Sequence, residues 1–289
     1  MEQQTTITNS QTIVGRHNGP PLGNVTQPEP RTKVQEPTYV TMSLHPGKVA
    51  IALCSITAVL AAADVAVLSA DYYTGYSSVV IHKLVKLFDL GLEVNVPAYF
   101  SVTLLFSAAV LVGLITLITK KQKGSHVIEW AILTFGFLFM GFDELASAHE
   151  RLIEPTRALL GIETPGLLYF AWVVPAIVLV AVIGTGFVKF LVDLPPRTRT
   201  AFMIAGSMYL GGAIGLELFE GACTVGSLAY NTLVVFEESL EMAGVIVFVW
   251  ALLDYLTTNF KANGVKFDIA TPSGPQDKKW AISDLGLQS

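Results

Sequence analysis

Acidic side chains inside long apolar segments are the feature of this sequence with the most chemical content. Glu237, Glu238 and Glu241 lie within the apolar stretch 228–256. A charged side chain at the centre of a bilayer costs about 2.5–3.5 kcal/mol on insertion scales. Because no Lys or Arg lies in the core of any apolar segment, we expect these carboxyl groups to be protonated or to bind a cation.

Three other apolar segments carry acidic residues as well. On an ideal helix, Glu217 and Glu220 lie about 60° apart, and Asp143 and Glu150 about 20° apart, so each pair would face one side. Glu144 points elsewhere on an ideal helix. The candidate residues for binding a cation or proton are therefore Glu237, Glu238, Glu241, Glu217, Glu220, Asp143, Glu150 and Asp64.

A metal site is a second interpretation of the same cluster. Carboxylates with one imidazole suit hard divalent ions such as Ca²⁺, Mg²⁺ or Mn²⁺, so a divalent metal is a possible cofactor. A di-iron centre in a helix bundle typically uses Glu-x-x-His units, whereas this chain has Glu-x-x-Glu. The candidate metal ligands are Asp143, His149, Glu217, Glu220, Glu238 and Glu241.

The elements that must position these residues are membrane helices. The chain is 52% hydrophobic and only 14% charged, against about 25% charged residues in soluble domains. About 20 apolar residues span a bilayer. Six segments reach that length, near residues 49–70, 99–118, 127–148, 166–192, 200–223 and 228–256. We expect an all-α membrane protein, built as a bundle of six transmembrane helices.

Local signals refine the fourth and fifth helices. Thr164 and Pro165 predict the start of the fourth, Pro175 a kink in its middle, and Pro195-Pro196 its end. In the fifth, Ser207, Gly211 and Gly215 form a row of small residues that would permit close helix packing.

The positions of Lys and Arg predict the orientation. In this topology 14 of the 18 basic residues lie on one side and four on the other. Since the basic side is normally cytoplasmic, both termini are expected there. The depths of the acidic residues then coincide in the outer half of the membrane. An integral membrane location follows, with a bacterial inner membrane as the expected one.

Three further regions complete the domain organisation. Val80, Ile81, Leu84, Val85 and Phe88 recur at helical spacing, which predicts an interfacial amphipathic helix between the first two spans. Residues 1–47 are polar and rich in proline, so they are expected to form a disordered cytoplasmic tail. Residues 48–257 form the transmembrane domain, and residues 258–289 a polar cytoplasmic tail.

Several classes of protein are excluded. No helix core contains the lysine that a retinal protein needs for its Schiff base, and no phosphate loop or basic patch points to nucleotides or nucleic acid. The expected partners are the lipid bilayer and a cation. The sequence predicts no particular protein partner.

The acidic motifs also carry a resemblance. Asp143-Glu144-(x)4-His149-Glu150 and Glu237-Glu238-Ser239-Leu240-Glu241-Met242 resemble signatures in a loose group of bacterial multi-pass membrane proteins. The resemblance covers roughly residues 45–257, with an interfacial stretch over 87–99. It implies the membrane class and a shared acidic site, and no particular activity.

The expected function is therefore cation binding in the outer half of the bundle, in the service of ion transport or proton coupling. Two alternatives stay open. One is a membrane metalloenzyme that acts on a lipid-like substrate. The other is a structural or assembly subunit whose carboxylates pair with basic groups of a partner.

Overall fold

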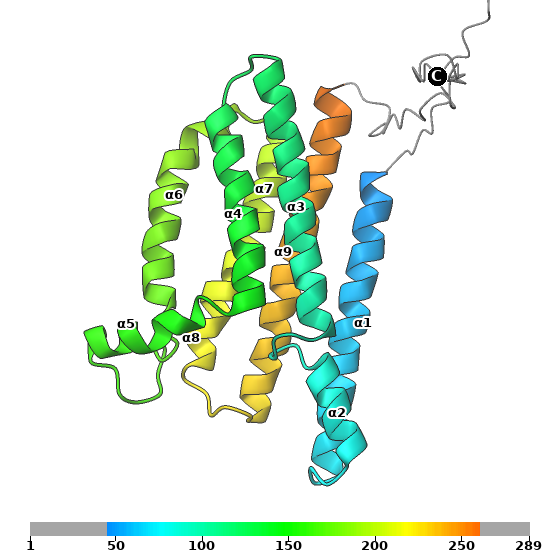
Figure 1. Ribbon diagram of the computed structural model, residues 1–289, viewed down its shortest axis with the longest axis vertical. Coiled ribbons are helices and arrows are strands. Elements are labelled where there is room, and N and C mark those ends of the chain that lie inside the picture. The colour runs from blue at the N-terminus through cyan, green and yellow to red at the C-terminus, as the bar shows by residue number, and fades with distance from the viewer. Residues whose placement is uncertain (1–44, 261–289) are drawn as a thin grey trace, which may run out of the picture. The chain divides into compact units, whose positions relative to one another are not determined.

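The computed structural model describes residues 45–260, and every regular element in this range is a helix (Figure 1). The predicted tails fall almost wholly outside the described residues. In chain order the elements are α1 (Pro46–Tyr73), α2 (Val79–Phe88), α3 (Val96–Lys121), α4 (Val127–Ala146), the 3-10 turn η1 (Glu150–Leu152), α5 (Ile153–Leu160), α6 (Val173–Asp193), α7 (Pro196–Leu210), the π-helical turn η2 (Gly211–Leu216), α8 (Glu217–Glu220) and α9 (Leu228–Asn259).

Long apolar helices define a multi-pass membrane protein. Among the described residues, α1, α3, α6, the combined segment Pro196–Glu220 and α9 are long and apolar enough to cross a membrane. The count rises to six only if α4 and the short helices after it form one span, and those are bent by 77°. The structure thus supports five or six spans.

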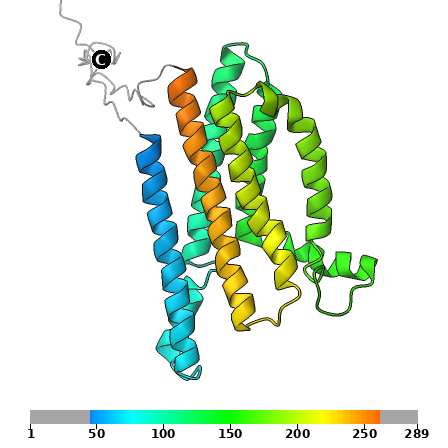
Figure 2. The same cartoon turned by 180° about the vertical axis from the view of Figure 1, so that it is seen from behind.

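The bundle packs around α3 and α9. Leu104, Val112 and Ile115 of α3 and Ile246 and Leu252 of α9 are almost wholly buried. Figure 1 shows α4 beside α3, and Figure 2 shows α7 beside α9 from behind. Large aliphatic side chains of α1 and α6 are exposed, as expected for helices that face lipid.

Helix α6 begins later than predicted. The expected start at residues 164–166 is wrong, because α6 begins at Val173. The chain before it turns, and the amide of Gly166 donates a hydrogen bond to the carbonyl of Gly221 at 2.9 Å. Pro175 consequently lies in the first turn of α6 rather than at a mid-helix kink. The predicted end is correct, since α6 stops at Asp193 and Pro196 opens α7.

The fifth span changes its helical pitch in the middle. After α7 the chain forms the π-helical turn η2 before α8, whereas a continuous helix was predicted. Close packing against α9 occurs at Gly212, where a Cβ atom would lie 2.8 Å from the carbonyl oxygen of Glu237. The glycines of the predicted row of small residues do not make this close contact with α9. A Cβ atom on Gly211 would meet nothing within 4 Å, and one on Gly215 would lie 4.0 Å from the carbonyl oxygen of Leu210 in the preceding turn.

Helix α4 ends before the predicted boundary. Ser147 takes a left-handed conformation at φ 46°, and the chain then runs across the end of the bundle as η1 and α5 (Figure 1). Glu150 therefore does not share a helix face with Asp143, and the predicted angle of 20° between them does not apply.

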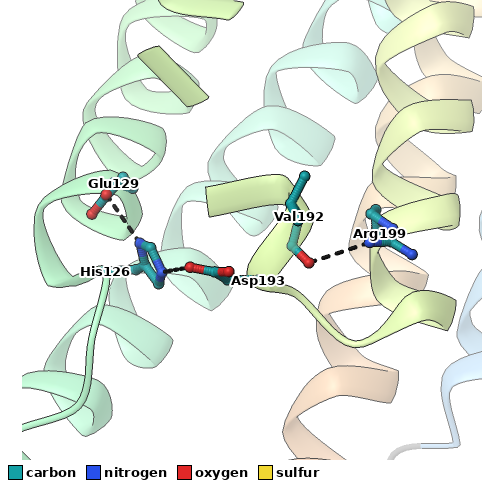
Figure 3. A network of polar contacts seen from close by, with 5 residues as sticks. All are labelled: His126, Glu129, Val192, Asp193 and Arg199. Atoms are coloured by element: carbon teal, nitrogen blue, oxygen red, sulfur yellow. Dashed lines mark hydrogen bonds and ion pairs between the residues drawn. The ribbon is translucent and has the colours of Figure 1, made fainter. Parts of the chain in front are cut away.

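A polar network joins two helices at the other end of α4. His126 precedes α4, and its Nδ1 lies 3.0 Å from Glu129 Oε1 (Figure 3). Its Nε2 lies 2.9 Å from Asp193 Oδ2, at the end of α6. Arg199 Nη1 donates to the carbonyl of Val192 at 3.2 Å. These contacts fix the turns on the side of the bundle that is predicted to be cytoplasmic.

Candidate functional site: an acidic cavity

One cavity brings most of the predicted acidic residues together. It has a volume of about 170 Å³ and lies between α4, η1, η2, α8, α9 and the loops beside them. Its acidic lining consists of Glu93, Asp143, Glu144, Glu150, Glu217, Glu220, Glu237, Glu238 and Glu241. His149 lines it too, but none of its described lining residues is Lys or Arg.

Helix α9 supplies one wall of the cavity. Ser227 caps the start of α9 by accepting a hydrogen bond from the amide of Tyr230 at 3.2 Å, as serine commonly does at this position. Glu237 and Glu241 follow on one face, and Glu237 is only 7% exposed. Because α9 is continuous through these positions, their spacing is fixed by ordinary helix geometry.

The π-helical turn places the second wall. A π-helix has a wider turn than an α-helix, and such turns often occur at functional sites. The turn η2 leads directly into α8, whose Glu217 and Glu220 line the cavity opposite α9. Because Gly212 has no Cβ atom, the backbones of η2 and α9 can approach closely. The carboxyl groups of the two walls thereby line one cavity.

Three of these carboxyl groups come from the two facing walls. Glu217 and Glu220 of α8 and Glu237 of α9 line the same cavity, and Glu217 Oε1 accepts a hydrogen bond from Trp172 Nε1 at 3.1 Å. Ionised carboxylates only accept hydrogen bonds, so a hydrogen bond between two such side chains would need a proton on one of them. Glu220 is 4% exposed, and its Oε1 has no hydrogen-bond partner. The trio therefore offers a buried acceptor that no described protein group satisfies.

Asp143 and His149 form a pair at the end of α4. Asp143 accepts hydrogen bonds from the backbone amide of His149 at 2.9 Å and lies 2.8 Å from His149 Nδ1. An ionised carboxylate only accepts hydrogen bonds, so beside an ionised Asp143 the Nδ1 atom of His149 carries a hydrogen and donates it.

Trp172 connects this pair to the carboxyl trio. Its indole Nε1 donates to Glu217 Oε1 at 3.1 Å, and its ring packs against the imidazole of His149 with centroids 4.6 Å apart. Tyr209 of α7 is a second polar aromatic residue in the lining, near Glu241. The hydrogen bond from Trp172 orients the carboxyl group of Glu217.

Exposure falls from the rim of the cavity to its interior. Glu93 and Glu150 are exposed, Asp143 and His149 are intermediate, and Glu220 and Glu237 are buried. The acidic lining thus runs from exposed groups in the loop before α3 and in η1 to the buried Glu220 and Glu237.

Asp64 is the predicted site residue that lies elsewhere. It is 1% exposed in α1, and its Oδ1 accepts a hydrogen bond from the amide of Leu90 at 3.4 Å. Leu90 belongs to the loop over residues 89–95 that borders the cavity, and Asp64 itself is absent from the lining. Its observed contact holds that loop against α1.

The donor geometry does not form a metal site. Within residues 45–260, no three or more His, Cys, Asp or Glu side chains are arranged so that they could hold a metal ion. The six candidate metal ligands all line the cavity, but they do not converge on one point.

Sequence reasoning missed several lining residues. Glu144 lines the cavity, although an ideal helix directed it away, and α4 ends two residues after it. His149, predicted as a possible metal ligand, lines the cavity as well. Glu93, Trp172 and Tyr209 were not predicted. Glu93 had a signal, since it lies in the stretch 87–99 that carried the resemblance. No spacing rule indicated Trp172 or Tyr209.

The fold and cavity define a multi-pass helical membrane protein with an acidic interior. The chain belongs to the family described as a domain of unknown function (DUF8692), whose model matches residues 50–256. This agrees with a resemblance to a group without an assigned activity. No curated protein and no solved structure matched the chain.

Proposed function

We propose that this protein binds cations or protons in the acidic cavity and serves transport or proton coupling across its membrane. The observation that carries the proposal is the gathering of Glu217, Glu220 and Glu237 in one cavity without Lys or Arg in its described lining, where Glu220 Oε1 is buried without a hydrogen-bond partner. Such groups are stable at bilayer depth only when a proton or a cation compensates their charge. Loss of that proton or cation would leave negative charges uncompensated. Binding and release of the proton or cation would therefore change the net charge of the cavity.

The proposed topology has six spans, with α4 and the bent segment after it as the third and both termini in the cytoplasm. The distribution of Lys and Arg supports this orientation. It puts the cavity in the outer half of the membrane, with Glu93 and Glu150 at its outer rim. Helix α2 would then lie in the outer interface, with Val80, Leu84 and Leu87 exposed to lipid.

Ionisable groups inside membranes typically mark ion pathways, and the decrease in exposure from Glu150 to Glu237 supports such a path. The other residues proposed as cation or proton carriers are Glu238, Glu241, Glu217, Glu220 and Asp143. For the metalloenzyme alternative, the donor geometry of the described residues offers no support.

A flux assay tests the transport role. Purified protein in liposomes should carry H⁺, Na⁺ or K⁺ down an imposed gradient, recorded with ion-sensitive dyes. Glu241→Gln should reduce the flux at least tenfold, because it removes a carboxyl group from the path. Glu163→Gln is the matched control, since Glu163 is exposed and does not line the cavity, and it should leave the flux unchanged. Wild-type flux equal to that of empty liposomes would contradict a transport role.

A further inference from the structure

The acidic cavity is larger than a single bare ion requires. Liquid water occupies about 30 Å³ per molecule, so about 170 Å³ is the volume of between five and six waters. That is far more room than one dehydrated ion needs. It matches a small organic molecule of about six non-hydrogen atoms.

The carboxyl groups of the cavity form two sets. Glu217 and Glu220 of α8 line the cavity together with Glu237 of α9. Glu144 of α4 and Glu241 of α9 also line a second, smaller cavity that includes none of those three residues, and Glu238 lies one turn before Glu241 on α9. Each set alone could bind one positively charged group of a ligand. A ligand with two cationic ends could compensate both sets at once.

The free acceptor in the first set points to a ligand donor. Glu220 Oε1 is buried and without a hydrogen-bond partner, which is costly unless something donates to it. An ammonium group has three N–H donors and can bond several carboxyl oxygens that do not converge in the geometry a metal requires. Met140, Val234 and Phe170 add apolar lining, which suits a short alkyl chain.

We propose, building on the proposed function, that the cavity binds a short organic diamine with two ammonium groups. One ammonium group is held by the Glu217, Glu220 and Glu237 set, with Glu220 Oε1 as an acceptor. The other is held by the Glu144, Glu238 and Glu241 set. The alkyl chain lies against the apolar lining.

Calorimetric titration of the full-length protein in detergent tests this assignment. The probes are 1,4-diaminobutane, 1-aminobutane and K⁺ at equal ionic strength. The diamine should bind at least tenfold more tightly than the monoamine, because only the diamine reaches both sets. Glu220→Gln should weaken diamine binding at least fivefold, and the exposed control Glu163→Gln should not change it.

Two results would overturn the proposal. One is a diamine affinity no greater than that of the monoamine, and the other is an unchanged diamine affinity in Glu220→Gln. If Glu220→Gln does not fold, Glu238→Gln in the second set serves as the alternative variant and should also lose the preference for the diamine. Failure of the diamine together with normal ion flux would refute this ligand class alone, whereas absence of flux in the liposome assay would refute the proposed transport.

Discussion

At the scale of single residues, His126 links the start of α4 to the end of α6 outside the membrane core. Its two ring nitrogens face the carboxylates of Glu129 and Asp193, and only the imidazolium can donate to both. The hydrogen bond with Glu129 is the main cause that raises the pKa of His126, with Asp193 adding to it. The network joins the start of α4 to the end of α6 (Figure 3).

His126→Ala should therefore destabilise the protein in a pH-dependent way. A raised pKa in the folded state means that the stabilisation is full below the unfolded value near 6.5 and is lost as the pH rises through the folded value. We expect a loss of about 1 kcal/mol at pH 6 and a smaller loss at pH 9. Thermal unfolding in detergent at both pH values measures it, and an equal loss at the two would contradict this role.

For the acidic residues, the sequence predicted which residues are buried better than it predicted what their side chains contact. The cost of a charge in lipid pointed to Glu217, Glu220 and Glu237, which the cavity lining contains. It also pointed to Asp64, whose observed contact is with the loop before α3. Depth along a helix axis cannot separate a cavity residue from one that faces a neighbouring loop, because both are buried and acidic.

At the scale of elements, the π-helical turn η2 matters most for the site. It lies just before Glu217 and packs its Gly212 against the backbone of α9 beside Glu237 and Glu241. A periodicity of 3.6 residues predicted a helix over this range correctly, but no residue pattern predicted the change of pitch. The direction of Glu217 and Glu220 toward α9 depends on that turn.

Gly212→Ala should disrupt the packing of the two walls. The added Cβ would lie 2.8 Å from the carbonyl oxygen of Glu237 and 3.0 Å from Cγ of Glu241, and such overpacking typically costs about 1–3 kcal/mol. Gly211→Ala is the matched control, because its Cβ would meet nothing within 4 Å. It should be neutral or stabilising by up to about 1 kcal/mol. Equal thermal stability of the two variants would refute the close approach at Gly212.

At the scale of the whole molecule, the apolar segments were the most predictable feature. Their lengths follow from bilayer thickness, and helices occur at all six predicted positions. Their ends were less predictable where backbone contacts decide them, as at Gly166 and Ser147. The orientation rests on the placement of Lys and Arg and stays a prediction.

Labelling from one side of the membrane tests that orientation. In a variant without Cys54 and Cys223, we expect Glu163→Cys to react with a membrane-impermeant maleimide on intact cells. Gln122→Cys, in the loop between α3 and α4, should react only after permeabilisation. The reverse pattern would place the cavity in the inner half of the membrane.

The most direct test of the central claim is to count the protons that a bound cation displaces from the cavity. Saturating K⁺, Na⁺ or diaminobutane should release protons from weakly buffered wild-type protein, because Glu217, Glu220 and Glu237 share a cavity whose described lining has no Lys or Arg to compensate their charge. Glu237→Gln should release fewer, and Glu163→Gln should release as many as the wild type. No release from the wild type with any of these cations, or equal release from Glu237→Gln, would contradict cation exchange at this cavity.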